Sequence, residues 1–188
     1  MSSFQPPRWA KPAPLGYGQA ADAAHFVAAP LLASAGVALI GVIGADGGRF
    51  RWPGATMLAL SLAVLALVGS VQYGFHARAL LYSVADLEAW WGTEDLGDRQ
   101  EALRSRQHRD YGLWKSTIDK AVSTYNTGVA LLGAGVSLCV APGPGTSAPD
   151  AVLRWVACAV VGTGALAEFL WALSARYPWL WFRRGARN

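Results

Sequence analysis

Four long apolar stretches divide this 188-residue chain. They cover residues 23–45, 52–77, 121–149 and 155–175. Only the last contains any Asp, Glu, Lys or Arg, as the single residue Glu168. A helix rises about 1.5 Å per residue and needs about 20 apolar residues to cross a bilayer core, and no stretch alternates with the period of two typical of a membrane strand. The pattern predicts four membrane-spanning helices, at about 22–45, 54–78, 119–142 and 151–177.

Turn-forming residues separate these spans. Gly and Pro occur between the first two spans and again in Pro142-Gly143-Pro144-Gly145. Ala33-Ser34-Ala35 resembles a signal-peptide cleavage site, but the apolar run continues to Ala45, so we expect a span there. The predicted fold class is an all-α membrane protein, a four-transmembrane-helix bundle with a cytoplasmic helical connector. Its predicted parts are a proline-rich tail at 1–20, the transmembrane domain at 21–182 with the connector at 79–118, and a basic tail at 183–188.

Small residues recur at four-residue spacing within the spans. Ala29 and Ala33, Ala59 and Ala63, and Cys158 and Gly162 form such pairs. Small residues at this spacing let membrane helices approach closely. Close helix packing is therefore predicted along these faces.

Charge predicts the orientation. The chain is 53% hydrophobic and 15% charged, against about a quarter charged in soluble domains. Thirteen of its 16 Lys and Arg residues lie before the first apolar stretch, between the second and third, or after the fourth. Because basic residues favour the cytoplasmic side, we expect a multi-pass protein of the cell membrane with both termini cytoplasmic. Topology thus explains the net charge of +4 without a nucleic-acid partner. The abundance of Ala, Gly and Arg is typical of a bacterial protein.

The opposite ends of the spans carry the remaining basic residues, Arg49, Arg51 and Arg154. Trp52 and Trp155 accompany them. Trp is enriched where membrane helices meet the headgroup layer. These two residues are therefore predicted to mark the outer boundary of the membrane.

The connector is the only sizeable polar segment, and its apolar residues recur at helical spacing. One interpretation is a solvated helical connector. The other is a surface that docks the membrane, a protein partner or a second copy through exposed aromatic rings. The candidate docking residues are Trp90, Trp91, Tyr111 and Trp114.

Polar side chains within the predicted spans gather in their cytoplasmic halves. They are Asp22, His25, Gln72, Tyr73, His76, Asn126 and Glu168. An ionisable group at this depth is costly unless it is paired or neutral, which makes Glu168 a candidate functional residue. Two interpretations stay open: hydrogen bonds that hold helices together, and a polar vestibule that binds an ion or ligand or forms part of a pore. A haem held by His25 and His76 is a third possibility, although further histidines within the spans would then be expected.

Motifs for enzymatic chemistry are missing from the sequence. It has no Gly-x-x-x-x-Gly-Lys loop and no Gly-x-Ser-x-Gly elbow. We expect a non-enzymatic protein without a metal or cofactor, which self-associates into a channel-like or scaffold assembly and uses the connector for sensing or docking. The alternatives are an accessory subunit of a membrane enzyme or transporter complex and a small haem-binding redox protein.

Overall fold

The computed structural model describes residues 17–82, 84–91 and 100–176, and all regular structure in these ranges is helical. The elements are α1 (Tyr17–Ala23), the π-helical turn η1 (Ala24–Ala28), α2 (Ala29–Ala45), the 3-10 turn η2 (Gly47–Arg49), α3 (Pro53–Arg78), α4 (Val84–Trp91), α6 (Gln100–Val140) and α7 (Ala148–Arg176). The all-α prediction is confirmed. The predicted tail at 183–188 and residues 1–16 of the proline-rich tail lie outside the described residues.

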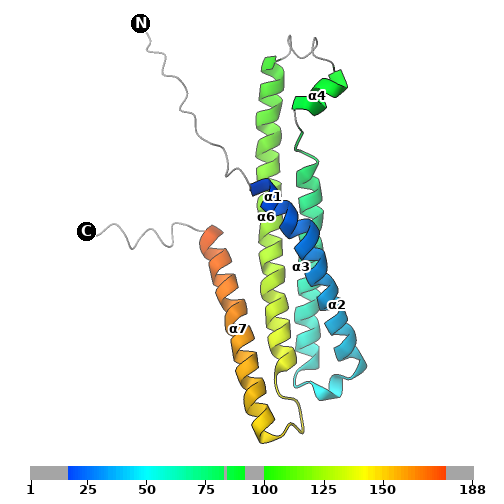
Figure 1. Ribbon diagram of the computed structural model, residues 1–188, viewed down its shortest axis with the longest axis vertical. Helices are drawn as coiled ribbons and strands as arrows, with labels where there is room; N and C mark the ends of the chain where they lie inside the picture. The colour runs from blue at the N-terminus through cyan, green and yellow to red at the C-terminus, as the bar shows by residue number, and fades with distance from the viewer. Residues whose placement is uncertain (1–16, 83, 92–99, 177–188) are drawn as a thin grey trace, which may run out of the picture.

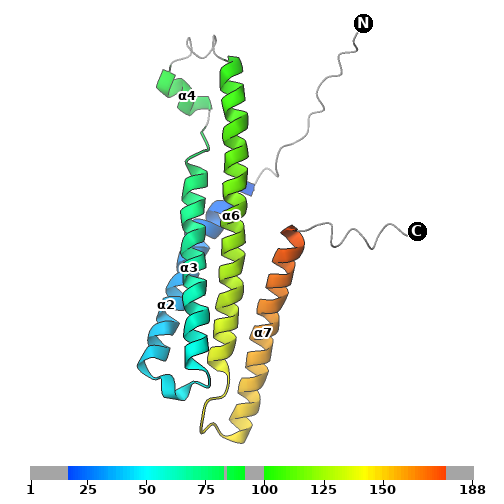
Figure 2. The same cartoon turned by 180° about the vertical axis from the view of Figure 1, so that it is seen from behind.

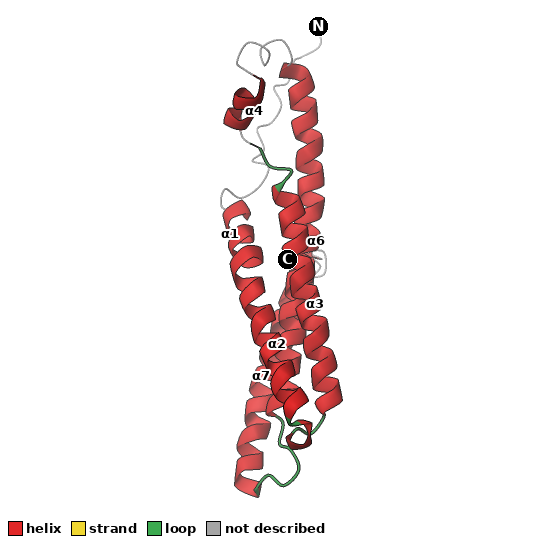
Figure 3. Ribbon diagram, turned by 90° about the vertical axis from the view of Figure 1, so that its right-hand side faces the viewer, coloured by secondary structure: helices red, strands yellow, loops and turns green. Residues whose placement is uncertain are grey.

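The long helices run side by side, and α7 lies beside α6 (Figure 1). The rod formed by α1, η1 and α2 packs on α3 and also contacts α6, α3 packs on α6, and α6 packs on α7. Seen from behind, α7 again lies beyond α6, on the side away from α2 and α3 (Figure 2). The short helix α4 lies near the first turns of α6, and the view by secondary structure shows the loops at the opposite end (Figure 3). We call that opposite end, residues 46–52 and 141–147, the loop end.

Three helical segments are long and apolar enough to cross a membrane: Gly18–Ala45, Pro53–Arg78 and Ala148–Ser174. The sequence pattern predicts a fourth at 119–142, and those residues fall in the second half of α6 and the loop after it. This half begins with five consecutive polar residues, 123–127, which dilute its apolar character. The first half of α6 is highly charged.

Glycines allow α6 to pack closely on both of its neighbours. A Cβ atom added at Gly135 would lie 2.6 Å from Leu60 Cδ2 of α3, and one added at Gly133 would lie 2.7 Å from Ala165 Cβ of α7. Close backbone approach provides the van der Waals contact that associates helices in lipid. Members of the predicted small-residue pairs are also buried where helices meet. They are Ala29 and Ala33 of α2 and Ala63 of α3.

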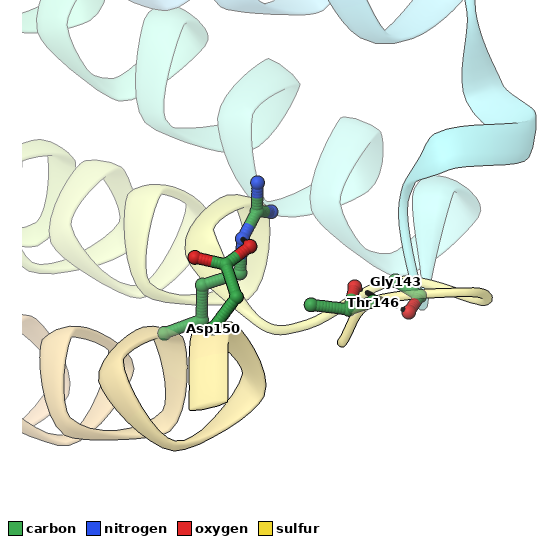
Figure 4. Close-up of polar contacts among 4 residues, drawn as sticks. Gly143, Thr146 and Asp150 are labelled. Atoms are coloured by element: carbon green, nitrogen blue, oxygen red, sulfur yellow. Dashed lines mark hydrogen bonds and ion pairs between the residues drawn. The ribbon is translucent and has the colours of Figure 1, made fainter. Parts of the chain in front are cut away.

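The two loops of the loop end dock on each other at Gly143 (Figure 4). A Cβ atom there would lie 1.9 Å from the carbonyl oxygen of Arg49, so only glycine fits this approach. Thr146 Oγ1 donates a hydrogen bond of 2.8 Å to the carbonyl oxygen of Gly143. Gly145 has a φ of 80°, a conformation that side chains disfavour. These contacts fix the hairpin formed by α6 and α7 against the hairpin formed by α2 and α3.

Replacing Gly143 with Ala is expected to separate the loops and to lower the free energy of unfolding by about 1–2 kcal/mol, because a backbone segment must move. In a protein of this size that corresponds to a fall of about 2–8 °C in the melting temperature in detergent. Gly48→Ala is the control, because no atom lies within 4 Å of a Cβ atom at that position. Equal melting temperatures for the two variants would contradict the docking.

Candidate functional site

His25 is the most buried ionisable side chain of the described membrane-length helices, with 1% of its surface exposed. It lies in η1, where the Ala29 N–H bonds to the carbonyl oxygen of Ala24, five residues earlier. Pro30 follows at once and has no N–H to donate. A wider π turn next to the proline ring is a common way for a helix to absorb this interruption, and such turns are frequent at functional sites.

Two helices form the pocket around this imidazole. Nδ1 of His25 shares a hydrogen bond of 2.7 Å with Ser70 Oγ of α3. Gly74, one turn further along α3, leaves room for the ring, since a Cβ atom there would lie 3.0 Å from His25 Cβ. Tyr125 of α6 meets the ring edge to face at 5.9 Å between centroids. We call this arrangement of His25, Ser70, Gly74 and Tyr125 the His25 notch.

The Ser70 hydroxyl differs in its hydrogen-bond partner from other hydroxyl groups in the membrane-length helices. Thr56 and Thr163, for example, donate to carbonyl oxygens of their own helices, Thr56 to Trp52 and Thr163 to Ala159. Ser70 instead joins two helices through the imidazole. The other ring nitrogen, Nε2, is buried and has no hydrogen-bond partner among the described residues. The notch therefore holds an imidazole with one nitrogen bonded to the neighbouring helix and the other without a hydrogen-bond partner among the described residues.

An ion pair lies close to the notch, at the end of α3. Arg78 Nη1 is 3.9 Å from Asp22 Oδ2, and the Arg78 guanidinium lies 5.7 Å from the centre of the Phe26 ring. The side chains of Arg78 and Asp22 are 65% and 47% exposed, so water screens their attraction and the pair adds little to stability. Asp22 precedes His25 by three residues, so the pair lies about one helical turn from the imidazole.

Other residues of the predicted polar layer are not gathered at the notch. Gln72, Tyr73 and His76 are exposed on α3, and His76 Nδ1 bonds to the carbonyl oxygen of Gln72 at 2.8 Å. Asn126 is partly buried on α6, and Glu168 is partly buried on α7, which packs along α6. The two histidines of the haem hypothesis therefore face different surroundings, one the protein interior and one the surface.

Sequence reasoning missed Ser70, Gly74 and Arg78. The signal that identifies them is their four-residue spacing, which places all three on one face of α3. Ser70 and Gly74 form one of the small-residue pairs that mark a close helix contact. A histidine on the neighbouring span is a natural partner for a hydroxyl on such a face.

The predicted docking residues have different environments. Trp114 is 6% exposed and packs with Ala21, Ala77 and Ala121, so its indole belongs to the core and is unavailable to a partner. Tyr111 packs partly buried beside it, with 5.3 Å between the ring centroids. Trp90 and Trp91 belong to the last turn of α4, and their side chains lie outside the described part of the chain. Trp114 thus holds the charged half of α6 against α1 and α3.

A hydrogen bond links the segment after α3 to the charged half of α6. The Tyr82 hydroxyl donates to Asp110 Oδ2 at 3.1 Å. The pKa of Tyr82 is raised above its ordinary value. Partial burial of the phenol is the largest cause, and this hydrogen bond is the next. Because the raised pKa belongs to the folded state, the bond stabilises the fold fully below about pH 10, the ordinary pKa of tyrosine, and this contribution is lost as the pH rises further.

Above pH 10 the melting temperature of the unaltered chain should fall, because a phenolate at position 82 would repel the Asp110 carboxylate. With Tyr82→Phe this fall is expected to be smaller, since phenylalanine does not ionise. Melting temperatures in detergent from pH 7 to pH 11 check this. Tyr73→Phe, on an exposed position of α3, is the matched control. Identical alkaline profiles for Tyr82→Phe and the unaltered chain would show that the bond does not form.

An open apolar groove runs between α6 and α7, with a volume of about 470 Å³. Its lining is mostly small or apolar, and includes Ala130, Ala134, Ser137, Gly162, Ala165 and Phe169. Ser137 Oγ donates a hydrogen bond of 2.9 Å to the Cys158 carbonyl oxygen, which ties the two helices together. Large apolar side chains of α7 are exposed along its length, among them Leu153, Val160, Leu166 and Trp171.

Three membrane-length helices, in a structure whose described residues form helices as their only regular structure, indicate a membrane protein. The chain matches no protein-family model, and no curated protein or solved structure shows significant similarity to it. The function of the chain is therefore inferred from the packing of α7, the groove between α6 and α7, and the length of α6.

Proposed function

We propose that this chain is a multi-pass membrane protein that self-associates into a channel-like or scaffold assembly. The second half of α6 serves as its fourth span, and both termini lie in the cytoplasm. The observation that carries the proposal is the position of α7, whose packing on other long helices is confined to α6. A closed bundle would give this helix contacts on two sides.

Support for a fourth span comes from the charge pattern of α6. Residues 121–140 contain no charged side chain and extend about 30 Å as a helix. The polar residues that dilute this stretch include two hydroxyl groups satisfied by their own helix: Thr124 donates to the Lys120 carbonyl oxygen and Thr127 to that of Ser123. Hydroxyls bonded in this way lose much of their cost in lipid.

The groove between α6 and α7 supports self-association. Its small residues, such as Ala134 and Gly162, would let a helix of a second copy approach closely. The exposed side chains of α7 supply the complementary bulk. An assembly formed in this way would use α6 as the inner helix and α7 as the helix that meets the next copy.

The charged half of α6 supports a sensing or docking role. It runs from Gln100 to Lys120, has a length of about 30 Å, and continues into the proposed span without a break in the helix. Trp114 and the bond between Tyr82 and Asp110 fix it to the other helices. A partner that displaces this half would therefore also displace the part of α6 that lines the groove.

Self-association is tested by filling the groove. Ala134→Phe is expected to convert the detergent-solubilised or nanodisc particle from an oligomer to a monomer, measured by light scattering. Val37→Phe, at an exposed position of α2 that lies away from the groove and from α7, should keep the oligomer. A monomeric unaltered chain that co-purifies with another membrane protein would instead establish an accessory subunit.

Conductance measurements on the unaltered chain and on a Glu168 variant distinguish a channel from a scaffold. It follows Ala165 of the groove by three residues and is partly buried. If the assembly conducts ions, Glu168→Gln is expected to reduce cation conductance in planar bilayers while the oligomer mass stays unchanged, since a charge beside a pore attracts counter-ions. Absence of conductance in the unaltered oligomer would leave the scaffold as the function.

A further inference from the structure

Arg51 occupies an unusual position at the loop end, between the two tryptophans predicted to mark the membrane boundary. Its guanidinium carbon lies 5.0 Å from the centre of the Trp52 ring and 5.6 Å from that of Trp155. The two indoles meet edge to face, 6.3 Å apart. Because Trp52 precedes α3 and Trp155 belongs to α7, one cation bridges the two helical hairpins.

The backbone around Trp52 is fixed before any ligand binds. Its carbonyl oxygen accepts the Thr56 N–H at 3.0 Å and the Thr56 hydroxyl at 2.8 Å. Thr56 itself is fully buried. A cation held over this indole therefore has a defined position, which lowers the entropic cost of binding an anion there.

Among the charged side chains of the loop end and of the first two turns of α7, all except Arg51 have a partner of opposite charge. Arg49 pairs with Asp46, and Arg154 pairs with Asp150 at 3.4 Å. Within the described ranges, no carboxylate lies within ion-pair distance of Arg51. This guanidinium thus keeps its hydrogen-bond donors for a ligand, while the aromatic faces stabilise its charge.

We propose that Arg51, Trp52 and Trp155 form a binding site for the phosphate of a membrane phospholipid. Trp52 and Trp155 are 42% and 44% exposed at the ends of membrane-length helices, which is where headgroups lie. A planar guanidinium binds phosphate oxygens through paired hydrogen bonds, and the half-exposed indoles offer apolar surface to the upper acyl chains. The proposal rests on the membrane placement described above, but not on self-association.

Lipid retention tests the site. The full chain, purified in detergent, is titrated with phosphatidylglycerol, phosphatidylcholine or diacylglycerol, and bound lipids are counted by native mass spectrometry. Both phospholipids should bind, and diacylglycerol, which lacks the phosphate, should bind at least about tenfold more weakly, as expected for the loss of a charge-assisted hydrogen-bonded pair. Arg51→Ala should weaken phospholipid binding by a similar factor, and Arg51→Lys by less, because the charge remains.

The matched controls are Arg49→Ala and Arg154→Ala, which remove nearby basic residues of the loop end and of α7 that already have carboxylate partners. Both should change phospholipid binding less than twofold. Trp155→Leu provides a second variant and should weaken binding by removing one aromatic face. Unchanged binding in Arg51→Ala, or equal losses in all three arginine variants, would overturn the proposal.

Inorganic phosphate distinguishes a lipid site from a site for a free anion. Millimolar inorganic phosphate should not displace the phospholipid, since it lacks the acyl chains. Complete displacement would overturn the assignment to lipid. Ala134→Phe, which tests self-association, should retain phospholipid as the unaltered chain does, so failure of the assembly and failure of the lipid site give different results.

Discussion

Replacing Gly135 with Val is expected to force α3 and α6 apart and to lower the free energy of unfolding by about 3 kcal/mol. A Cβ atom at this position would lie 2.6 Å from Leu60 Cδ2, 2.8 Å from Leu60 Cγ and 3.5 Å from the Leu60 backbone nitrogen. Leu60 is fully buried, so its side chain cannot turn aside without displacing its neighbours. Two further methyl groups at position 135 would therefore have to be accommodated by moving a whole helix.

The melting temperature in detergent measures this effect, and a loss of about 3 kcal/mol corresponds to a fall of about 6–12 °C for a chain of this size. Gly164→Val on α7 and Gly41→Val on α2 are the controls, because no atom lies within 4 Å of a Cβ atom at either position. Both should melt within about 2 °C of the unaltered chain. A Gly135→Val protein that melts with the controls would show that α3 and α6 do not approach closely at this level.

The helical content and most helix ends follow from the sequence, because they depend on local properties. Absence of charge delimits the apolar helices, and the Gly and Pro residues of the loop end separate them. The buried faces of Ala29, Ala33 and Ala63 also follow, since small residues at helical spacing indicate close contacts. These features need no knowledge of which helix packs on which.

The site could be predicted only in part, because it depends on the order of the helices. His25 was recognisable as a polar residue in an apolar helix, but its partner Ser70 depends on η1 facing α3. The π turn itself depends on the register next to Pro30 and has no clear signature in composition. Glu168 could lie near Gln72 and Tyr73 only if α7 packed against α3. Instead α7 packs along α6, on the side away from α2 and α3.

Trp114 illustrates the same limit at the other end of α6. In the sequence its apolar neighbours are separated by charged residues, a pattern that indicates an exposed helix. The structure places Ala21 of α1 and Ala77 of α3 against its indole, two small residues that are distant in sequence. A single aromatic side chain can be covered by such residues without any change in the surrounding charge pattern.

His25→Ala is expected to lower the free energy of unfolding by about 3 kcal/mol, because two losses combine. The imidazole is almost fully buried, so its removal leaves a cavity between η1 and α3. The Ser70 hydroxyl also loses the partner that it bonds at 2.7 Å. His76→Ala, at an exposed position of α3, is the control and should change the free energy by less than about 0.5 kcal/mol.

A double-mutant cycle with Gly74 shows whether the loss comes from packing in the notch. Gly74→Ala places a methyl group 3.0 Å from His25 Cβ and 3.3 Å from His25 Cγ, so in the unaltered chain it should destabilise by about 1–2 kcal/mol. In the His25→Ala background the contacts with Cγ and Cδ2 are removed, whereas the contact of 3.0 Å with the Cβ atom of position 25 remains, so the same methyl group should cost less than in the unaltered chain. The coupling between the two substitutions should therefore be favourable by about 0.5–1 kcal/mol, whereas additive effects are expected for residues that do not touch. Additivity in the measured melting temperatures would place His25 away from Gly74 and would falsify the geometry of the notch.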